Sequence, residues 1–337
     1  MFLKLRDSER AQKLLKRAQE LYPDDFWINF HLASAFSGAR PINHEQVTRY
    51  YAIARALRPQ SVGVRLALAR SLYRKGERDE AIAEYRRAVA LDPQNGSARR
   101  SLGGALAGNG NRDEAIAEYR RAVALDPKNF NARYELGQAL RAKGDLNAAI
   151  AEYRRAVTLD PRGPLAHMTL GDALLAKRDV DGAIAEYRQW GALDPKKPVA
   201  AHSSLGDALR AKGDLEGAIA EYRKALPLDP KHFLAPYAHL TLGDVLWANG
   251  DLEGAIAEYR RAVPLDPKHP SASFAHTTLG KALEAKGDLE GAIAEYRRAV
   301  PLDPKDPFAS IAHARLGNAL RRRGTTPVTL PADVFAH

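Results

Sequence analysis

The feature that most constrains this chain is an internal repeat. The phrase Gly-Asp-Leu-Glu-Gly-Ala-Ile-Ala-Glu-Tyr-Arg-Arg-Ala-Val-Pro-Leu-Asp-Pro-Lys starts at Gly250 and again at Gly287, and looser copies run back through most of the 337 residues. Seven copies close with an Asp-Pro pair, and successive prolines lie 34, 34, 34, 35, 37 and 37 residues apart: Pro93, Pro127, Pro161, Pro195, Pro230, Pro267 and Pro304. A fixed period of this length predicts a solenoid, in which each unit contacts only its neighbours.

Each copy has the pattern of two amphipathic helices. In residues 62–93, apolar side chains recur three and four positions apart before Gly76, and a second such set follows up to Pro93. This spacing is typical of helices that bury one face. Glycine suits the left-handed residue just past a helix end, and proline cannot continue a helix. The sequence therefore predicts an all-α fold of helix, tight turn, helix, turn.

Small and aromatic residues occupy fixed places in each copy. The copy at 130–161 shows a small residue after leucine, an alanine opening the second helix, a large aromatic, a late alanine and a closing proline: Leu136, Gly137, Ala149, Tyr153, Ala156 and Pro161. This pattern resembles the tetratricopeptide repeat (TPR) family, and it covers nearly all of the chain. The resemblance implies a right-handed α-solenoid superhelix.

The copies predict the following organisation. Residues 1–25 form a lone helix, residues 26–307 form eight repeats, residues 308–324 form a second lone helix, and residues 325–337 form an extended tail. The expected copies span 26–59, 62–93, 96–127, 130–161, 164–195, 199–230, 236–267 and 273–304, of the 34-residue type to about 198 and of 35–37 residues after it.

In the last three copies a proline enters the second helix one turn early. The residue before a proline avoids helical angles, so these helices should end near that residue. The residues concerned are Leu226, Val263 and Val300.

One copy departs from the others. At 164–195, Arg178 stands where other copies carry a glycine, although the left-handed conformation is unfavourable for arginine. Trp190 replaces the late alanine, and an indole does not fit an alanine-sized space. We expect local repacking here, with an exposed anchor or hinge as the alternative.

Composition narrows the class of protein. The net charge is +10, but the arginine doublets of the second helices follow glutamates, so that Glu84 can pair with Arg87. This pattern favours a solvated, ion-paired outer face, and we expect no nucleic-acid partner. No run approaches the roughly 20 apolar residues of a membrane span, so we expect no membrane partner. Because residues 1–8 lack the apolar run of a secretory signal, we predict a cytoplasmic protein, or an extracellular one if it forms a surface filament.

The chain contains no cysteine, no glycine-rich phosphate loop and no nucleophile or metal motif, so we predict no catalysis, no cofactor and no metal. Histidines recur once per copy at His167, His202, His239, His276 and His313. Equivalent residues of adjacent copies lie about 8–10 Å apart, too far to share a metal ligand. Their early position on first helices indicates a packing or capping role.

In TPR proteins the first helices line a concave surface where partners bind. The resemblance therefore implies that this chain is a scaffold for a protein or peptide. Its partner-binding residues would be Arg70, Tyr73, Arg74, Arg100, Tyr134, Gln138 and Arg141 in the first half, and Met168, Asp172, Asp207, Arg210, Tyr237, Asp244, Trp247 and Lys281 in the second. A basic and aromatic half followed by an aspartate ladder suits a long peptide with an acidic and a basic end. The alternative is plain solvated polarity, because Asp207 can pair with Arg210 on its own helix.

The two lone helices carry an alternative function. Apolar residues on them, namely Leu14, Leu15, Ala18, Leu316 and Leu320, would let copies associate head to tail as filaments or rings. The tail at 325–337 could instead fold back as a cap. A third hypothesis is a regulatory extension of a larger bacterial kinase-like protein, because residues 18–27 are similar to segments that follow kinase domains in some bacterial serine/threonine kinases.

Overall fold

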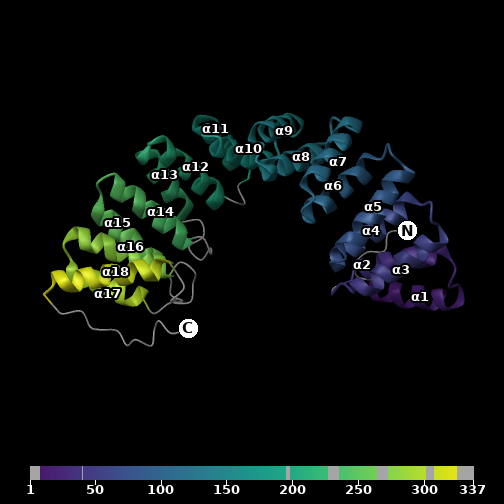
Figure 1. The fold of residues 1–337 in the computed structure, drawn as a ribbon, viewed down its shortest axis with the longest axis horizontal. Coiled ribbons are helices and arrows are strands. Elements are labelled where there is room, and N and C mark those ends of the chain that lie inside the picture. Colours follow the sequence, from purple (N-terminus) through teal and green to yellow (C-terminus); the bar gives the residue numbers. More distant parts are fainter. Residues whose placement is uncertain are drawn as a thin grey trace. The chain divides into compact units, whose positions relative to one another are not determined.

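The structure is a computed structural model that describes residues 8–39, 41–194, 198–226, 235–263, 272–300 and 307–324. These residues form helices α1 to α18 and their connections, and the described ranges contain no strand (Figure 1). The all-α fold class is confirmed. The chain divides into two compact units, Met1–Ala166 and His167–His337, and each is described by itself.

The first unit is a stack of helix pairs. Its helices are α1 Ser8–Leu21, α2 Phe26–Ser37, α3 His44–Leu57, α4 Val62–Lys75, α5 Arg78–Leu91, α6 Gly96–Gly108, α7 Arg112–Leu125, α8 Phe130–Lys143 and α9 Leu146–Leu159. Hairpins form between α2 and α3, α4 and α5, α6 and α7, and α8 and α9, and each second helix packs on the next first helix. Helix α1 packs on α2 in the way that α3 packs on α4.

The second unit repeats this arrangement. Its helices are α10 Pro164–Ala176, which begins in the first unit, α11 Val180–Leu193, α12 Pro198–Lys212, α13 Leu215–Ala225, α14 Ala235–Ala248, α15 Leu252–Ala262, α16 Ala272–Lys286, α17 Leu289–Ala299 and α18 Pro307–Arg322. Helices α12 and α13, α14 and α15, and α16 and α17 form hairpins, and α18 packs on both α17 and α16. Each unit therefore alternates first and second helices along its length.

The second helices are shorter where the sequence places an early proline. Helices α13, α15 and α17 have 11 residues each, whereas α5, α7 and α9 have 14. They end at Ala225, Ala262 and Ala299, next to the residues that precede the prolines. The expected early ends are confirmed, while the prolines themselves lie outside the described residues.

Close helix pairing depends on a glycine that faces a tyrosine. A Cβ atom added to Gly137 on α8 would lie 2.6 Å from the ring of Tyr153 on α9, and one added to Gly280 on α16 would lie 2.5 Å from the ring of Tyr296 on α17. Because no real Cβ tolerates such distances, the glycine is what lets the ring enter. The tyrosines of this position include some of the largest fully buried side chains, Tyr153, Tyr222, Tyr259 and Tyr296.

The departures in the fifth copy are accommodated locally. Arg178 has a φ of +67°, the left-handed conformation that glycine adopts at Gly144 and Gly213. Trp190 is 4% exposed, and its ring centroid lies 6.3 Å from that of Tyr187 on the same helix. The burial of Trp190 agrees with local repacking, and the alternative of an exposed tryptophan anchor is wrong, whereas a hinge at this copy stays a prediction.

Candidate functional site

Four of the five periodic histidines join the two helices of a repeat, and the fifth, His313, lies on α18, which has no paired second helix among the described residues. The Nδ1 atom of His202 on α12 lies 2.6 Å from Oε2 of Glu221 on α13, and His239 and Glu258 are joined in the same way at 2.7 Å. His167 and His276 make equivalent contacts with Glu186 and Glu295. The predicted packing role is correct in outline. The partner is a glutamate 19 residues later, however, and not the helix end that capping would require.

In the first unit an arginine takes the place of the histidine. Arg65 on α4 donates to Glu84 on α5 at 2.7 Å, and the equivalent pairs are Arg99–Glu118 and Arg133–Glu152 at 2.9 Å. We call this Arg/His–Glu contact the helix clamp. Glu84 is 5% exposed and also accepts from Arg87 at 2.6 Å, which confirms the predicted pairing. The clamp therefore ties one member of each arginine doublet to the helix interface.

On the first helices of the first unit, two arginines face one small cavity. Arg70 and Arg74, both exposed on α4, line a cavity of about 100 Å³ with Tyr51 of α3. The other lining residues are Ser37, Ile42, His44, Val47, Ala67 and Ser71. Burial raises the pKa of Tyr51, while the charges of Arg70 and Arg74 act to lower it. Arg70 also forms a side-chain hydrogen bond with the hydroxyl of Tyr85 on α5. Neither guanidinium forms an ion pair with a described residue, and we call Arg70 and Arg74 the arginine pair.

Other predicted residues of the first unit contact neighbouring repeats or helices. Arg100 on α6 donates to Glu135 on α8 at 2.6 Å, and burial raises the pKa of Glu135 despite this contact. Gln138 donates to the hydroxyl of Tyr134 at 2.6 Å on the same helix. The hydroxyl of Tyr73 occupies the space next to Gly108 on α6.

Arg141, near the end of α8, is exposed. Arg70, Arg74 and Arg141 are therefore the predicted residues of this unit that are exposed.

In the second unit the predicted aspartate ladder is engaged within the chain. The hydroxyl of Tyr187 donates to Asp172 at 2.8 Å, that of Tyr222 to Asp207 at 2.6 Å, and that of Tyr259 to Asp244 at 2.7 Å. Burial and the neighbouring carboxylate raise the pKa of all three tyrosines, which therefore remain donors. Sequence reasoning missed these bonds, although an Asp fifteen residues before the Tyr recurs in three successive copies.

The remaining predicted residues of this unit give a surface of mixed charge. Arg210 lies 3.5 Å from Asp207, as the alternative of plain polarity expected. Burial and then the charge of Arg315 lower the pKa of Lys281, with Asp244 opposing them. Tyr237 is exposed.

Two more predicted positions of this unit are less accessible. Trp247 stands edge-on to Tyr259 with ring centroids 6.4 Å apart, and Met168 is half-buried. Neither side chain is a fully exposed anchor.

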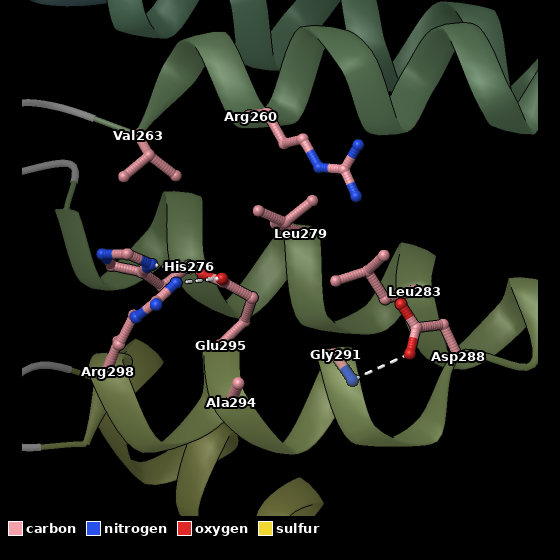
Figure 2. A pocket seen from close by; sticks show the side chains of 10 residues that line it. All are labelled: Arg260, Val263, His276, Leu279, Leu283, Asp288, Gly291, Ala294, Glu295 and Arg298. Atoms are coloured by element: carbon pink, nitrogen blue, oxygen red, sulfur yellow. Dashed lines mark hydrogen bonds and ion pairs between the residues drawn. The ribbon is translucent and has the colours of Figure 1, made fainter.

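A larger hollow lies on the second-helix side of the repeats. It has a volume of about 410 Å³ and is bounded by Arg260 of α15 above Leu279 and Leu283 of α16 (Figure 2). On the left of the view, His276 and Arg298 both contact Glu295 (Figure 2). On the right, Asp288 accepts a hydrogen bond from the backbone N–H of Gly291 (Figure 2). None of these side chains was a predicted partner-binding residue.

The two lone helices differ in how they present their apolar residues. On α1, Leu14 is 72% exposed, and Leu15 and Ala18 are half-buried. On α18, Leu316 is half-buried, whereas Leu320 is only 8% exposed. The expectation that Leu320 is available for self-assembly is wrong, because the packing of α18 on α16 and α17 already covers it.

A metal site and a membrane span are two other features that would indicate a function. The described residues contain no group of three or more His, Cys, Asp or Glu side chains placed to hold a metal ion. No helix in the described ranges is both long and apolar enough to cross a membrane.

Comparison with solved structures finds TPR proteins. MamA is 28% identical, with 49% of this chain and 90% of that chain covered and a TM-score of 0.47. YrrB, described as a TPR protein with an unusual peptide-binding site, is 23% identical, with coverages of 56% and 96% and a TM-score of 0.48. PilF of Pseudomonas aeruginosa is 17% identical, with coverages of 65% and 97% and a TM-score of 0.49. A search of curated proteins found no match.

Family models give the more direct result. Models described as tetratricopeptide repeat match residues 66–130, 101–164, 134–198 and 234–305, and one described as TPR repeat matches residues 206–250. Together these matches span well over half of the sequence. The Gly137–Tyr153 and Gly280–Tyr296 contacts, and the hairpins formed by α6 to α9 and by α14 to α17, lie within the matched ranges. The chain therefore belongs to the tetratricopeptide repeat family.

Proposed function

We propose that this chain is a non-catalytic scaffold that binds a protein or peptide partner along the surface of its first helices. Family membership supports an interaction role, because stacked repeats present extended binding surfaces without a catalytic centre. The second helices are less suited to this task. Their glutamates and one arginine of each doublet are committed to the helix clamp.

The observation that carries the proposal is the arginine pair. Arg70 and Arg74 stand one helical turn apart on α4 and border a cavity that also contains polar side chains from α3. A guanidinium presents a fork of donors that matches a carboxylate, so two adjacent forks suit neighbouring acidic groups of a peptide. The partner segment that contacts the first unit is therefore acidic.

The second unit plays a different part in this proposal. Its three aspartates accept hydrogen bonds from buried tyrosines, so they serve the packing of each hairpin. We therefore do not propose that these aspartates bind the basic end of a peptide. Exposed Tyr237 and half-buried Trp247 offer apolar contacts there instead.

A peptide selection tests the proposal. A display library of random peptides is panned against the wild-type chain, against Arg70→Glu/Arg74→Glu, and against Arg120→Glu/Arg154→Glu. The last variant makes the same charge change on exposed second-helix residues and serves as the matched control. Wild type and control should enrich acidic peptides, and the α4 variant should lose them. Equal enrichment by all three chains would remove the arginine pair from the binding surface.

A further inference from the structure

The geometry points to a second copy of this chain as the partner of its two lone helices. Helix α18 of one copy and helix α1 of the next would pair as the first and second helices of a composite repeat. This inference goes beyond binding on the first helices. It assigns a different surface, at the two ends of the stack, and it does not depend on the arginine pair.

The order of helices sets up this pairing. In the described residues the stack begins with a helix that packs as a second helix, because α1 lies on α2 as α3 lies on α4. It finishes with a helix that packs as a first helix, because α18 lies on α17 as α16 lies on α15. Placing α1 of another copy beside α18 continues the alternation without interruption.

Helix α18 has an open position where a second helix belongs. In six other first helices the glycine of this position is filled by a tyrosine ring of the second helix, at Gly103, Gly137, Gly171, Gly206, Gly243 and Gly280. A Cβ atom added to Gly317 meets no atom within 4 Å among the described residues. Its neighbour Leu316 is half-buried, whereas the equivalent Leu279 is 3% exposed. Among the described residues, no helix occupies the side of α18 that a second helix covers in the other repeats.

Helix α1 carries the matching pattern in the matching register. Before Pro23 it places small residues at Ala11 and Ala18, as the second helix α5 does before Pro93. Ala11 is already buried within the single chain and Ala18 is half-buried, whereas α5 buries the equivalents of both completely. The register is the same to the residue.

Two leucines, Leu14 and Leu15, lie between these alanines on α1. Leu15 stands where α5 has Tyr85, the residue whose equivalents enter the glycine position, and Leu14 stands where α5 has the clamp glutamate Glu84. Leu14 is exposed and uncharged, so covering it gains apolar burial without desolvating a carboxylate. The first-helix clamp residue on α18 is His313, so the composite repeat would lack the clamp's carboxylate and have an apolar contact in its place.

The contact is heterologous, because one end of a copy meets the opposite end of the next. Such a contact does not stop at two copies, and it produces rings or filaments. Two variants block the two ends separately. Leu14→Lys places a positive charge where other second helices carry the clamp glutamate, opposite the position of His313 on α18, and Leu14 is exposed in the single chain. Gly317→Glu fills the open position, where an added Cβ atom meets no described atom of its own copy.

Sedimentation velocity over a range of concentrations tests the inference. Wild type should grow in mass with concentration, and each variant should remain a monomer. Gly63→Glu, at another helical glycine with nothing within 4 Å, and Leu91→Lys, at another exposed leucine, are the matched controls and should assemble like wild type.

An equimolar mixture of the two variants gives the sharpest result. The free α18 of Leu14→Lys can bind the free α1 of Gly317→Glu, so the mixture should form a 1:1 dimer and stop there. A wild-type chain that stays monomeric at every concentration overturns the inference. So does assembly that Gly317→Glu leaves intact, because that outcome assigns the contact to another surface.

Discussion

The hydroxyl of Tyr222 donates a 2.6 Å hydrogen bond to Asp207, which precedes it by fifteen residues on the paired helix. The phenol is buried against Gly206, so its hydroxyl has few other places to find an acceptor. The same bond joins Tyr259 to Asp244 and Tyr187 to Asp172. An aspartate that looks like part of a binding surface is thus also part of the hairpin's internal packing.

Replacing Asp207 should therefore weaken its repeat. In Asp207→Ala the buried hydroxyl loses its acceptor, which costs about 1–3 kcal/mol of unfolding free energy. Urea unfolding followed by circular dichroism measures the loss. The double variant with Tyr222→Phe, which removes both partners, should lose less than the sum of the two single variants. Strictly additive losses would show that the bond does not contribute.

The helix clamp should make the second unit less stable at acid pH. Burial opposes ionisation of Glu258, but the hydrogen bonds and charges of His239 and Arg261 outweigh it and hold the pKa of Glu258 below its ordinary value of 4.5. A lowered carboxyl pKa contributes stability that is present above pH 4.5 and is lost as the pH falls through the folded-state pKa. Urea midpoints should therefore fall as the pH drops below 4.5. The fall should be shallower in Glu258→Gln, and an equal slope in both chains would contradict this role.

Arg178 should be replaceable by glycine with a gain in stability. Its φ of +67° lies in the left-handed region, which costs an ordinary residue about 1–2 kcal/mol and costs glycine little. Arg178→Gly should raise the unfolding free energy by about 1 kcal/mol after glycine's extra entropy is counted. The reverse change, Gly144→Arg, should lower it by a similar amount. Differential scanning calorimetry of both variants measures these changes. A destabilised Arg178→Gly would mean that the arginine side chain supports the turn.

The glycine that faces tyrosine should tolerate no methyl group. In Gly280→Ala the new carbon would lie 2.5 Å from the Tyr296 ring, and such overpacking costs about 1–3 kcal/mol. Gly317→Ala meets no atom and should gain up to about 1 kcal/mol from helix propensity. The measurement is thermal unfolding at low protein concentration, where the chain ends are free. Similar effects at both positions would contradict the account of Gly317 as an open position.

The helices could be predicted from the sequence because the residues at their ends determine where each one stops. Gly76 ends one helix, Pro93 follows the next, and the early proline of the later copies shortens α13, α15 and α17 as expected. Trp190 is buried, and Arg178 adopts the left-handed conformation that its place in the turn requires, although this conformation is unfavourable for arginine.

The side-chain pairings of the site were harder to predict. Periodicity shows that His239 lies early on a first helix, but not that its ring reaches Glu258 on the next helix. The signal was present, since an arginine or histidine precedes a second-helix glutamate by 19 residues in seven copies. Recognising it requires knowing how far the two helices are staggered. Leu320 was missed for a related reason, because one side of α18 is already covered by the helices before it.

The most direct test of the scaffold account is to locate a bound partner on the chain. Hydrogen–deuterium exchange is measured with and without an acidic peptide obtained from the selection on wild type. The account predicts slower exchange on α4, around Arg70 and Arg74, and on the neighbouring first helix α6, with α5 and α7 unchanged. Protection confined to second helices, or to the hollow beside Arg260, would contradict it.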